Sequence, residues 1–211
     1  MAGGPDFSFE EAAHARGCRR VAGVDEVGRG ALCGPVVAAA VRLDPRRIPA
    51  GLNDSKLLTA RQRTALNERI LAVAEVALGE ASVEEIDRLN VLRASQLAMC
   101  RALAALATPP DHVLIDGHLV PPQLDRSAEA VVRGDARSLS IAAASIVAKV
   151  HRDRLMVDLA QQHPGYGWER NAGYPTADHV AGLTALGATP HHRRTFAPVH
   201  NILYQEKFLT H

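Results

Sequence analysis

The stretch Val21-Ala-Gly-Val-Asp-Glu-Val-Gly-Arg-Gly30 joins a short apolar run to two adjacent carboxylates and a glycine-rich turn. A second apolar run, residues 36–41, follows it closely. Both runs, 21–24 and 36–41, predict strands because they are short, rich in valine and bounded by glycine and proline. Neighbouring side chains of a strand point to opposite faces, so Asp25 and Glu26 can reach one point only near a twisted strand end.

This carboxylate pair has two interpretations. Burying two carboxylates beside an apolar core is unfavourable unless a cation or hydrogen bonds compensate. One interpretation is therefore a polar corner of the chain with Glu26 in solvent. The other is a divalent-metal site beside a Gly28-Arg29-Gly30 loop whose glycines let a nucleic-acid backbone approach closely. The residues of this stretch alone favour the two about equally.

The composition is that of an ordinary globular protein. The chain has 211 residues, of which 47% are apolar and 22% charged, enough for one domain with a substantial core. Its net charge of +1 means that any nucleic-acid contact must rest on a local patch. The cysteines Cys18, Cys33 and Cys100 include no Cys-x-x-Cys pair, so neither a disulfide framework nor a thiolate zinc site is indicated.

The chain shows no sign of a membrane segment. No apolar run approaches the ~20 residues of a membrane span, and residues 1–17 contain no signal-peptide core. We therefore expect a cytoplasmic protein whose residues 1–17 form a flexible lead-in.

The apolar pattern predicts an α/β domain followed by a helical C-terminal extension. It predicts helices at 59–74, from 82 on, at 90–107 and at 140–162, and strands at 76–81, 112–116 and 131–132. The strand at 112–116 ends in Asp116, so it has the same pattern as the first strand: a short apolar run followed by a carboxylate. Thr189-Pro190 predicts one more helix start, and we expect the adjacent His191 and His192 to make surface or phosphate contacts.

Six motifs, in order, resemble those of bacterial ribonuclease HII and extend from about residue 20 to 200. They are Asp25-Glu-Val-Gly-Arg-Gly30, Leu52-Asn-Asp-Ser-Lys-Leu-Leu-Thr59, Ile115-Asp-Gly117, Arg133-Gly-Asp135, the block 140–153 and Gly173-Tyr-Pro-Thr-Ala-Asp-His179. The chain departs from the family pattern at Val27, where alanine is common, and at Leu57, where a second lysine often follows. The sister family, ribonuclease HIII, is a poorer match because Arg29 is retained and there is no room for its extra N-terminal domain.

The resemblance implies a ribonuclease H-like fold, in which a central mixed β-sheet is flanked by helices. It implies a catalytic domain at 18–211, with a helical region at about 160–211 that closes over the substrate. The implied activity is metal-dependent hydrolysis of the phosphodiester 5′ to a ribonucleotide, in RNA/DNA hybrids or in duplex DNA with embedded ribonucleotides. The products would carry 3′-hydroxyl and 5′-phosphate ends, as in ribonucleotide removal from DNA, and the enzyme would act as a monomer.

The resemblance assigns catalysis and metal binding to the carboxylates Asp25, Glu26, Asp116 and Asp135. Mg²⁺ and Mn²⁺ prefer oxygen ligands, and two such ions can activate the attacking water and stabilise the leaving oxygen. Asp153 is the rival fourth ligand. It ranks second because it lies in a helix between two arginines, where a structural ion pair is the commoner role.

The resemblance also assigns substrate contacts. Gly28, Arg29 and Gly30 match a loop that senses the ribose, whose 2′-hydroxyl both donates and accepts hydrogen bonds. Tyr174 matches a tyrosine that packs on the deoxyribose following the ribonucleotide. Lys56 would hold a phosphate, although Asn53-Asp-Ser-Lys56 could instead simply turn the chain. The charged helix turns at 149–154 fit either a solvated face or a phosphate path.

Two other functions remain open. One is a related two-metal nuclease or phosphoryl transferase of the same fold, which would have no use for the Gly-Arg-Gly loop and Tyr174. The other is a non-catalytic binding module, which would gain nothing from clustered carboxylates that repel phosphate.

Overall fold

The computed structural model describes residues 4–205, which form two compact units. The first unit contains residues 4–27, 37–80 and 95–150, and the second contains 28–36, 81–94 and 151–205. A search of residues 4–205 finds no helix with the length and apolar character that a membrane crossing requires.

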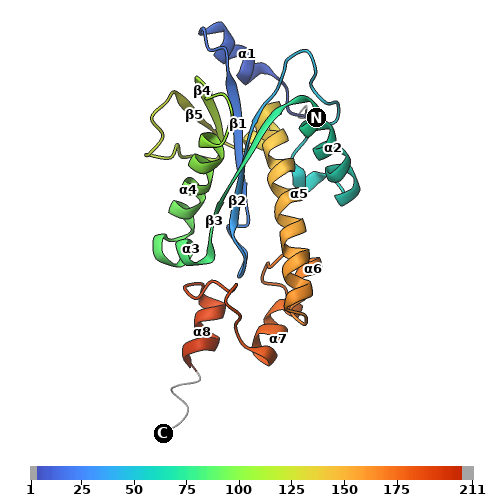
Figure 1. Ribbon diagram of the computed structural model, residues 1–211, viewed down its shortest axis with the longest axis vertical. Coiled ribbons are helices and arrows are strands. Elements are labelled where there is room, and N and C mark those ends of the chain that lie inside the picture. The colour runs from blue at the N-terminus through green and yellow to red at the C-terminus, as the bar shows by residue number, and fades with distance from the viewer. Residues whose placement is uncertain (1–3, 206–211) are drawn as a thin grey trace. The chain divides into compact units, whose positions relative to one another are not determined.

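A mixed five-stranded sheet is the centre of the first unit (Figure 1). Its strands, in spatial order, are β3 (Glu75–Ala81), β2 (Val36–Arg42), β1 (Val21–Val27), β4 (His112–Asp116) and β5 (Ala128–Val131). Strand β1 pairs antiparallel with β2 and parallel with β4, which in turn pairs parallel with β5. The predicted mixed sheet is confirmed, but two strands differ from their predicted bounds. Strand β1 continues past the predicted 21–24 to Val27 and so contains Asp25 and Glu26, and the last strand begins earlier than predicted and ends before Val132.

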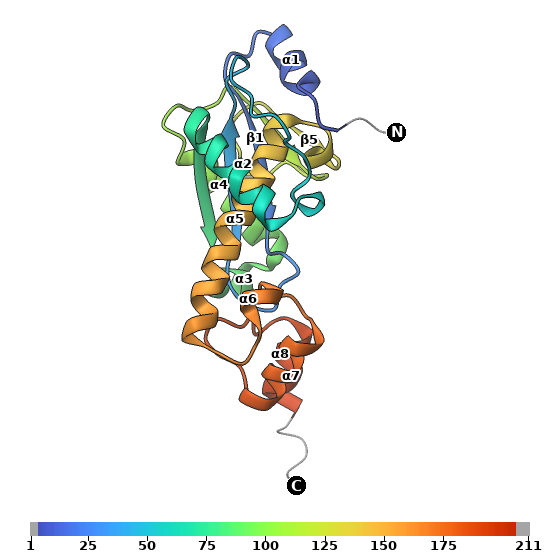
Figure 2. The ribbon, with the colours of Figure 1, turned by 90° about the vertical axis from the view of Figure 1, so that its right-hand side faces the viewer.

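Helices cover both faces of this sheet. They are α2 (Ala60–Val73), the later turns of α4 (Val91–Ala104) and the first half of α5 (Leu139–Gln162). Helices α4 and α5 lie on opposite sides of the sheet (Figures 1 and 2). Each approaches a strand glycine so closely that a side chain would not fit: a Cβ on Gly23 would lie 2.2 Å from the Ser140 carbonyl carbon, and one on Gly79 2.3 Å from the Ala98 oxygen. The helices therefore rest directly on the backbone of the sheet.

The prediction of a loosely packed lead-in is wrong for residues 8–15, which form helix α1 (Ser8–Ala15). Ala13 is fully buried against the start of β1 and the sheet core. The carboxylate of Glu10 is also fully buried, and its Oε1 accepts hydrogen bonds from Ser138 Oγ (2.7 Å) and Ser140 N (2.8 Å) at the start of α5. A carboxylate at a helix N-terminus complements the helix dipole, so α1 stabilises the helix that packs on the sheet.

The second unit is mainly helical. It contains α3 (Val83–Leu89), α6 (Trp168–Asn171), α7 (Ala177–Leu186) and α8 (Ala197–Gln205), besides the first turn of α4 and the second half of α5. The predicted helical C-terminal region is confirmed over the described residues, while 206–211 lie outside them. The predicted helix start at Thr189 is wrong, because Thr189 Oγ1 accepts from the His191 amide in a turn and α8 begins only at Ala197.

Candidate active site

The sheet brings two carboxylates of neighbouring parallel strands together. Val24 of β1 pairs with Ile115 of the parallel strand β4, so the residues that follow them, Asp25 and Asp116, are neighbours. Asp116 in turn pairs with Val131, the last residue of β5. A short 3₁₀ turn, η2 (Gly134–Ala136), comes just after β5 and carries Asp135. The parallel order of β1, β4 and β5 therefore gathers the three carboxylates at the carboxyl ends of the strands.

The three carboxylates form a close cluster. Ligand oxygens of Asp25, Asp116 and Asp135 all lie within 4.8 Å of one another. Asp25 and Asp135 are buried, and Asp116 is partly buried. Main-chain amides fix two of them: Glu26 N donates to Asp25 Oδ1 (2.7 Å) and Gly134 N donates to Asp116 Oδ1 (2.6 Å). The cluster is thus held by the backbone before any ligand arrives.

The turn that carries Asp135 has a strained entry. Arg133 adopts a left-handed conformation with φ of 52°, which is uncommon for a residue other than glycine. A Cβ on the next residue, Gly134, would lie 2.5 Å from the Ile141 side chain and 3.2 Å from Asp116 Oδ1. The turn therefore needs glycine at 134 to bring its amide onto Asp116, and such local strain is typical of functional sites.

Burial and mutual repulsion both disfavour the charged forms in the cluster. Burial, followed by the charges of Glu26, Asp116 and Asp135, raises the pKa of Asp25 well above its usual value. Burial, followed by the charge of Asp135, raises the pKa of Asp116. Carboxylate oxygens crowded in this way are the donors that hard divalent cations prefer. The residues present therefore fit a divalent metal ion, which would relieve the repulsion.

Lys56 lies beside this cluster. Its Nζ donates to Asp135 Oδ2 (3.2 Å) and lies 3.7 Å from Asp54 Oδ1. Desolvation lowers the pKa of Lys56, but the hydrogen bond to Asp135 and the nearby carboxylate charges outweigh it and raise the pKa. The chain turns here as the composition of 53–56 predicts, since Asp54 Oδ1 accepts from the Lys56 amide (2.9 Å). Lys56 thus keeps its charge at neutral pH and offsets part of the negative charge.

Two other candidate carboxylates, Glu26 and Asp153, are not part of this group. Glu26 follows Asp25 in strand β1, so its side chain leaves the opposite face of the strand; its ligand atoms are not in the 4.8 Å group found among residues 4–205. The rival ligand Asp153 lies in the half of α5 that belongs to the second unit. The geometry therefore brings together three of the four carboxylates that the sequence suggested.

In the second unit, the loop after β1 lies against Tyr174. Gly28 has φ of 94°, and a Cβ there would lie 2.2 Å from Arg152 Nε. A Cβ on Gly30 would lie 3.7 Å from Tyr174 Cε1, an ordinary contact distance. Arg29, between the two glycines, is exposed, and Tyr174 is half-buried. The predicted substrate-contacting loop and tyrosine are therefore neighbours.

Two buried arginines hold this loop, and no sequence pattern indicated that they are buried. Arg152 donates to the carbonyls of Cys33 (3.0 Å), Pro35 (3.0 Å) and Ala172 (2.8 Å).

The second buried arginine, Arg193, donates to the carbonyls of Gly34 (2.8 and 3.0 Å) and Arg29 (3.0 Å). Burial, and then the charge of Arg152, lowers the pKa of Arg193 to about 9. The expectation that the basic residues at 149–154 line a solvated face or a phosphate path is wrong for Arg152, which is fully buried like Arg193.

His192 is likewise not at the surface, contrary to the expectation for the His191–His192 pair. It is fully buried beside His179 and Trp168, whereas His191 is half-buried. Burial, and then the charge of His179, lowers the pKa of His192 to about 4. His192 is therefore neutral at physiological pH.

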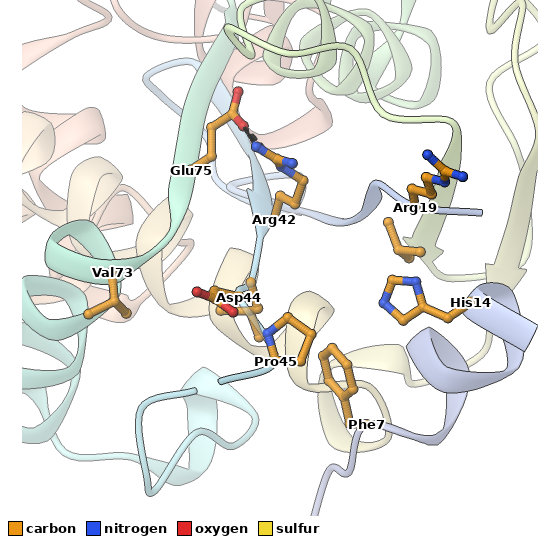
Figure 3. Close-up of a pocket in the computed structure, with 10 residues that line it drawn as sticks. Phe7, His14, Arg19, Arg42, Asp44, Pro45, Val73 and Glu75 are labelled. Atoms are coloured by element: carbon orange, nitrogen blue, oxygen red, sulfur yellow. Dashed lines mark hydrogen bonds and ion pairs between the residues drawn. The ribbon is translucent and has the colours of Figure 1, made fainter. Parts of the chain in front are cut away.

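A separate cavity of about 350 Å³ lies in the first unit. Its lining includes Val21 at the start of β1 and Arg42 at the end of β2, so it lies at the other end of β1 from Asp25. Arg42 forms an ion pair with Glu75 in one wall of the cavity (Figure 3), with Arg42 Nε 2.9 Å from Glu75 Oε2. This pairing neutralises charge in the wall and leaves the acidic cluster as the candidate catalytic centre.

Comparison with known proteins identifies close relatives along nearly the whole chain. The sequence model of the family described as Ribonuclease HII matches residues 22–200. Ribonuclease HII of Cereibacter sphaeroides is 68% identical over 202 residues, which cover 96% of this chain and 95% of the relative. Ribonuclease HII of Paracoccus denitrificans is 66% identical over 206 residues, which cover 98% of each chain.

Solved structures show the same fold. Ribonuclease H2 of Pyrococcus horikoshii matches with a TM-score of 0.74 at 28% identity, over 92% of this chain and 100% of that one. Bst-RNase HIII, solved in complex with Mn²⁺, matches in fold with a TM-score of 0.72 at 21% identity, over 93% of this chain and 73% of that one. The predicted ribonuclease H-like fold is confirmed. The chain belongs to the ribonuclease HII family, the metal-dependent endonucleases of the ribonuclease H type.

Proposed function

We propose that this protein hydrolyses the phosphodiester bond 5′ to a ribonucleotide, in RNA/DNA hybrids or in duplex DNA with embedded ribonucleotides, and leaves 3′-hydroxyl and 5′-phosphate ends. The observation that carries the proposal is the cluster of three carboxylates, Asp25, Asp116 and Asp135, whose oxygens lie within 4.8 Å of one another. Clustered carboxylates repel a phosphate backbone unless a cation is bound, so the arrangement suits a nuclease better than a binding module.

The clustered carboxylates Asp25, Asp116 and Asp135, together with Glu26 as the fourth ligand that the family resemblance assigns, would hold two Mg²⁺ or Mn²⁺ ions. Such ions, when bound, activate the attacking water and stabilise the leaving oxygen. The chain's own part is to fix the ligands, through the amides of Glu26 and Gly134 on two of the carboxylates. Lys56, whose Nζ donates to Asp135, would exchange that carboxylate for a phosphate oxygen when the substrate binds.

The loop of Gly28, Arg29 and Gly30 would read the 2′-hydroxyl through main-chain groups, since that hydroxyl both donates and accepts. The ring of Tyr174 would pack on the next sugar. Arg193 supports this assignment because it holds the Arg29 carbonyl at 3.0 Å and so fixes the loop in advance. Preorganised loops of this kind raise the rate by positioning the substrate. The protein would act as a monomer in the cytoplasm.

Cleavage of a DNA duplex with one ribonucleotide, in Mg²⁺ and in Mn²⁺, tests the proposal. We expect Asp135→Asn to lower the turnover rate by a factor on the order of 10³ or more while duplex binding persists, because the metal-dependent step is lost. The matched control is Asp158→Asn, which makes the same change at an exposed position of α5 and should leave the rate unchanged. An active Asp135→Asn together with an inactive Asp153→Asn would make Asp153 the fourth ligand.

A further inference from the structure

The buried histidine pair of the second unit has no part in the chemistry described so far. His179 and His192 are both fully buried, and their Nε2 atoms lie 3.2 Å apart. Trp168 Nε1 donates to His179 Nε2 (2.9 Å). Two neutral imidazoles and an indole are thus joined in one hydrogen-bonded group beside Tyr174.

The partners of the four ring nitrogens fix where the protons lie. His179 Nδ1 lies 3.0 Å from the Tyr174 carbonyl, which can only accept, so Nδ1 carries the proton. Its Nε2 is then an acceptor, as the bond from Trp168 also requires. His192 Nδ1 accepts from the Thr189 amide (2.9 Å), so the proton of His192 lies on Nε2 and points to His179. The single lone pair of His179 Nε2 is then shared between Trp168 Nε1 (2.9 Å) and His192 Nε2 (3.2 Å). Each tautomer is set by the bond that the other nitrogen makes.

This group connects the Tyr174 main chain to the loop after β1. The backbone around His192 runs beside that loop: Gly34 N donates to His191 O (2.9 Å), Arg193 N donates to Leu32 O (2.8 Å), and Cys33 and His192 form an isolated antiparallel bridge. The ring of His192 then reaches His179, which donates to the Tyr174 carbonyl. The hydrogen bonds to the main chain of 191–193, followed by the two histidine rings, therefore link the loop to the Tyr174 carbonyl, besides the direct bond from Leu32 N to Gly173 O (2.8 Å).

The Tyr174 carbonyl itself is well suited to fix the ring. It accepts from both His179 Nδ1 (3.0 Å) and Thr176 N (2.8 Å), so both of its lone pairs are engaged. The preceding Gly173 has φ of 80°, and a Cβ there would lie 2.8 Å from Cys33 Sγ. With the backbone held on both sides, the ring of Tyr174 has a defined position against Gly30.

We propose that His179 and His192 are positioning residues that set the ring of Tyr174 against the Gly28–Gly30 loop, and so determine how strictly the enzyme selects an RNA-to-DNA junction. The inference rests on the proposed role of Tyr174. Neither histidine touches the substrate; both act through the Tyr174 main chain.

The experiment compares kcat/KM for two substrates, a duplex with one embedded ribonucleotide and a long RNA/DNA hybrid. His179→Phe keeps a ring of similar size and removes the donor to Tyr174. A misplacement of about 1 Å can cost on the order of 100-fold, so we expect the ratio of single-ribonucleotide to hybrid kcat/KM to fall roughly 10- to 100-fold. His179→Asn, whose amide nitrogen replaces Nδ1 as donor, should keep most of the ratio. His200→Phe makes the same change at an exposed position and should leave the ratio unchanged.

A double-mutant cycle with Tyr174→Ala completes the test. Tyr174→Ala alone should lower the ratio, and His179→Phe should lower it no further in that background. If His179→Phe slows both substrates equally, or if His179→Asn loses as much selectivity as His179→Phe, the pair is only a structural brace and the inference is overturned. If Tyr174→Ala itself leaves the ratio unchanged, the proposed role of Tyr174 fails and this inference with it. If His179→Phe does not fold, His192→Phe replaces it, with a smaller fall in the ratio expected and an unchanged ratio counting against the inference.

Discussion

Replacing Asp25 by asparagine should stabilise the metal-free protein and abolish its response to metal. In the absence of a cation, Asp25 is a buried carboxylate within 4.8 Å of two others. Asparagine has nearly the same shape, and its side-chain oxygen can still accept the hydrogen bond that Glu26 N donates to Asp25 Oδ1. The substitution therefore removes repulsion without leaving that amide unpaired.

The size of the effect follows from the distances. Two unit charges 4.8 Å apart repel by about 3 kcal/mol at an effective dielectric constant of about 20. The wild type escapes part of this cost by protonating Asp25, whose pKa is raised, so we expect a net gain of about 1–3 kcal/mol in Asp25→Asn. For a chain of this length that corresponds to a rise in Tm of about 3–10 °C. Asp135→Asn should gain less, because it also breaks the ion pair with Lys56.

Thermal unfolding in EDTA and in excess Mn²⁺ measures both halves of the prediction. Mn²⁺ at about 100 times its dissociation constant should stabilise the wild type by about 2.7 kcal/mol. Asp25→Asn should lose most of that shift, so the order of the two Tm values should reverse between the two buffers. Asp158→Asn, an exposed substitution of the same kind, should follow the wild type in both.

The pH dependence gives an independent check in EDTA. Because the pKa of Asp25 is raised on folding, the native state binds more protons than the unfolded state above the unfolded pKa of about 4. The stability of the wild type should therefore fall as the pH rises from about 4 through the raised pKa, and Asp25→Asn should lack that component of the fall. A variant that is less stable than the wild type in EDTA, or that keeps the full Mn²⁺ shift, would refute the assignment of Asp25 to a metal site.

Three further predictions concern the packing of the second unit. Gly28→Ala should lower the free energy of unfolding in urea by about 2–4 kcal/mol, because the new Cβ meets Arg152 and the left-handed backbone disfavours alanine. The control Gly51→Ala, at a glycine with φ of 93° and open space around it, should show only the ~1–2 kcal/mol backbone part. The pKa of His192 falls to about 4 on folding, so the unfolded state binds an extra proton as the pH falls from about 6.5 to about 4. The free energy of unfolding should therefore fall by up to ~3 kcal/mol over that range. Urea unfolding at several pH values should show this loss in the wild type and a smaller loss in His192→Phe. Arg193→Met should cost about 3 kcal/mol or more because it leaves buried carbonyls without donors, and Arg193→Lys should recover only part of that cost in the same assay.

The sequence predicted the strand-end part of the site well. Asp25 and Asp116 each close a short apolar run, and apolar runs of that length mark buried strands whose ends meet at one edge of the sheet. Asp135 follows the shortest strand, and its place in the cluster depends on the left-handed turn at Arg133, which no local pattern indicated. The contact between Lys56 and Asp135 joins residues far apart in the chain, so periodicity could not have suggested it.

Buried polar residues were the main failure of sequence reasoning. Glu10, Arg152 and His192 were expected outside the core, and no sequence pattern marked Arg193 as buried, yet each of the four is fully buried. Hydrophobic periodicity indicates which apolar side chains are buried. A charged side chain, in contrast, is buried only where the folded chain supplies hydrogen-bond partners for it. For Glu10 and the two arginines those partners include main-chain groups of distant segments, such as the Ser140 amide for Glu10.

The loop after β1 explains why such partners exist. It lies between β1 and β2, is irregular, and forms no regular strand pairing that would engage all its carbonyls. Buried backbone carbonyls nevertheless require donors. A guanidinium group supplies five donors in a fixed plane, and two such groups engage the carbonyls of Arg29, Cys33, Gly34 and Pro35. A glycine-rich loop next to a catalytic strand therefore implies a demand for buried donors elsewhere in the chain. The sequence can indicate that this loop needs buried hydrogen-bond donors, but only the tertiary structure identifies Arg152 and Arg193 as the residues that supply them.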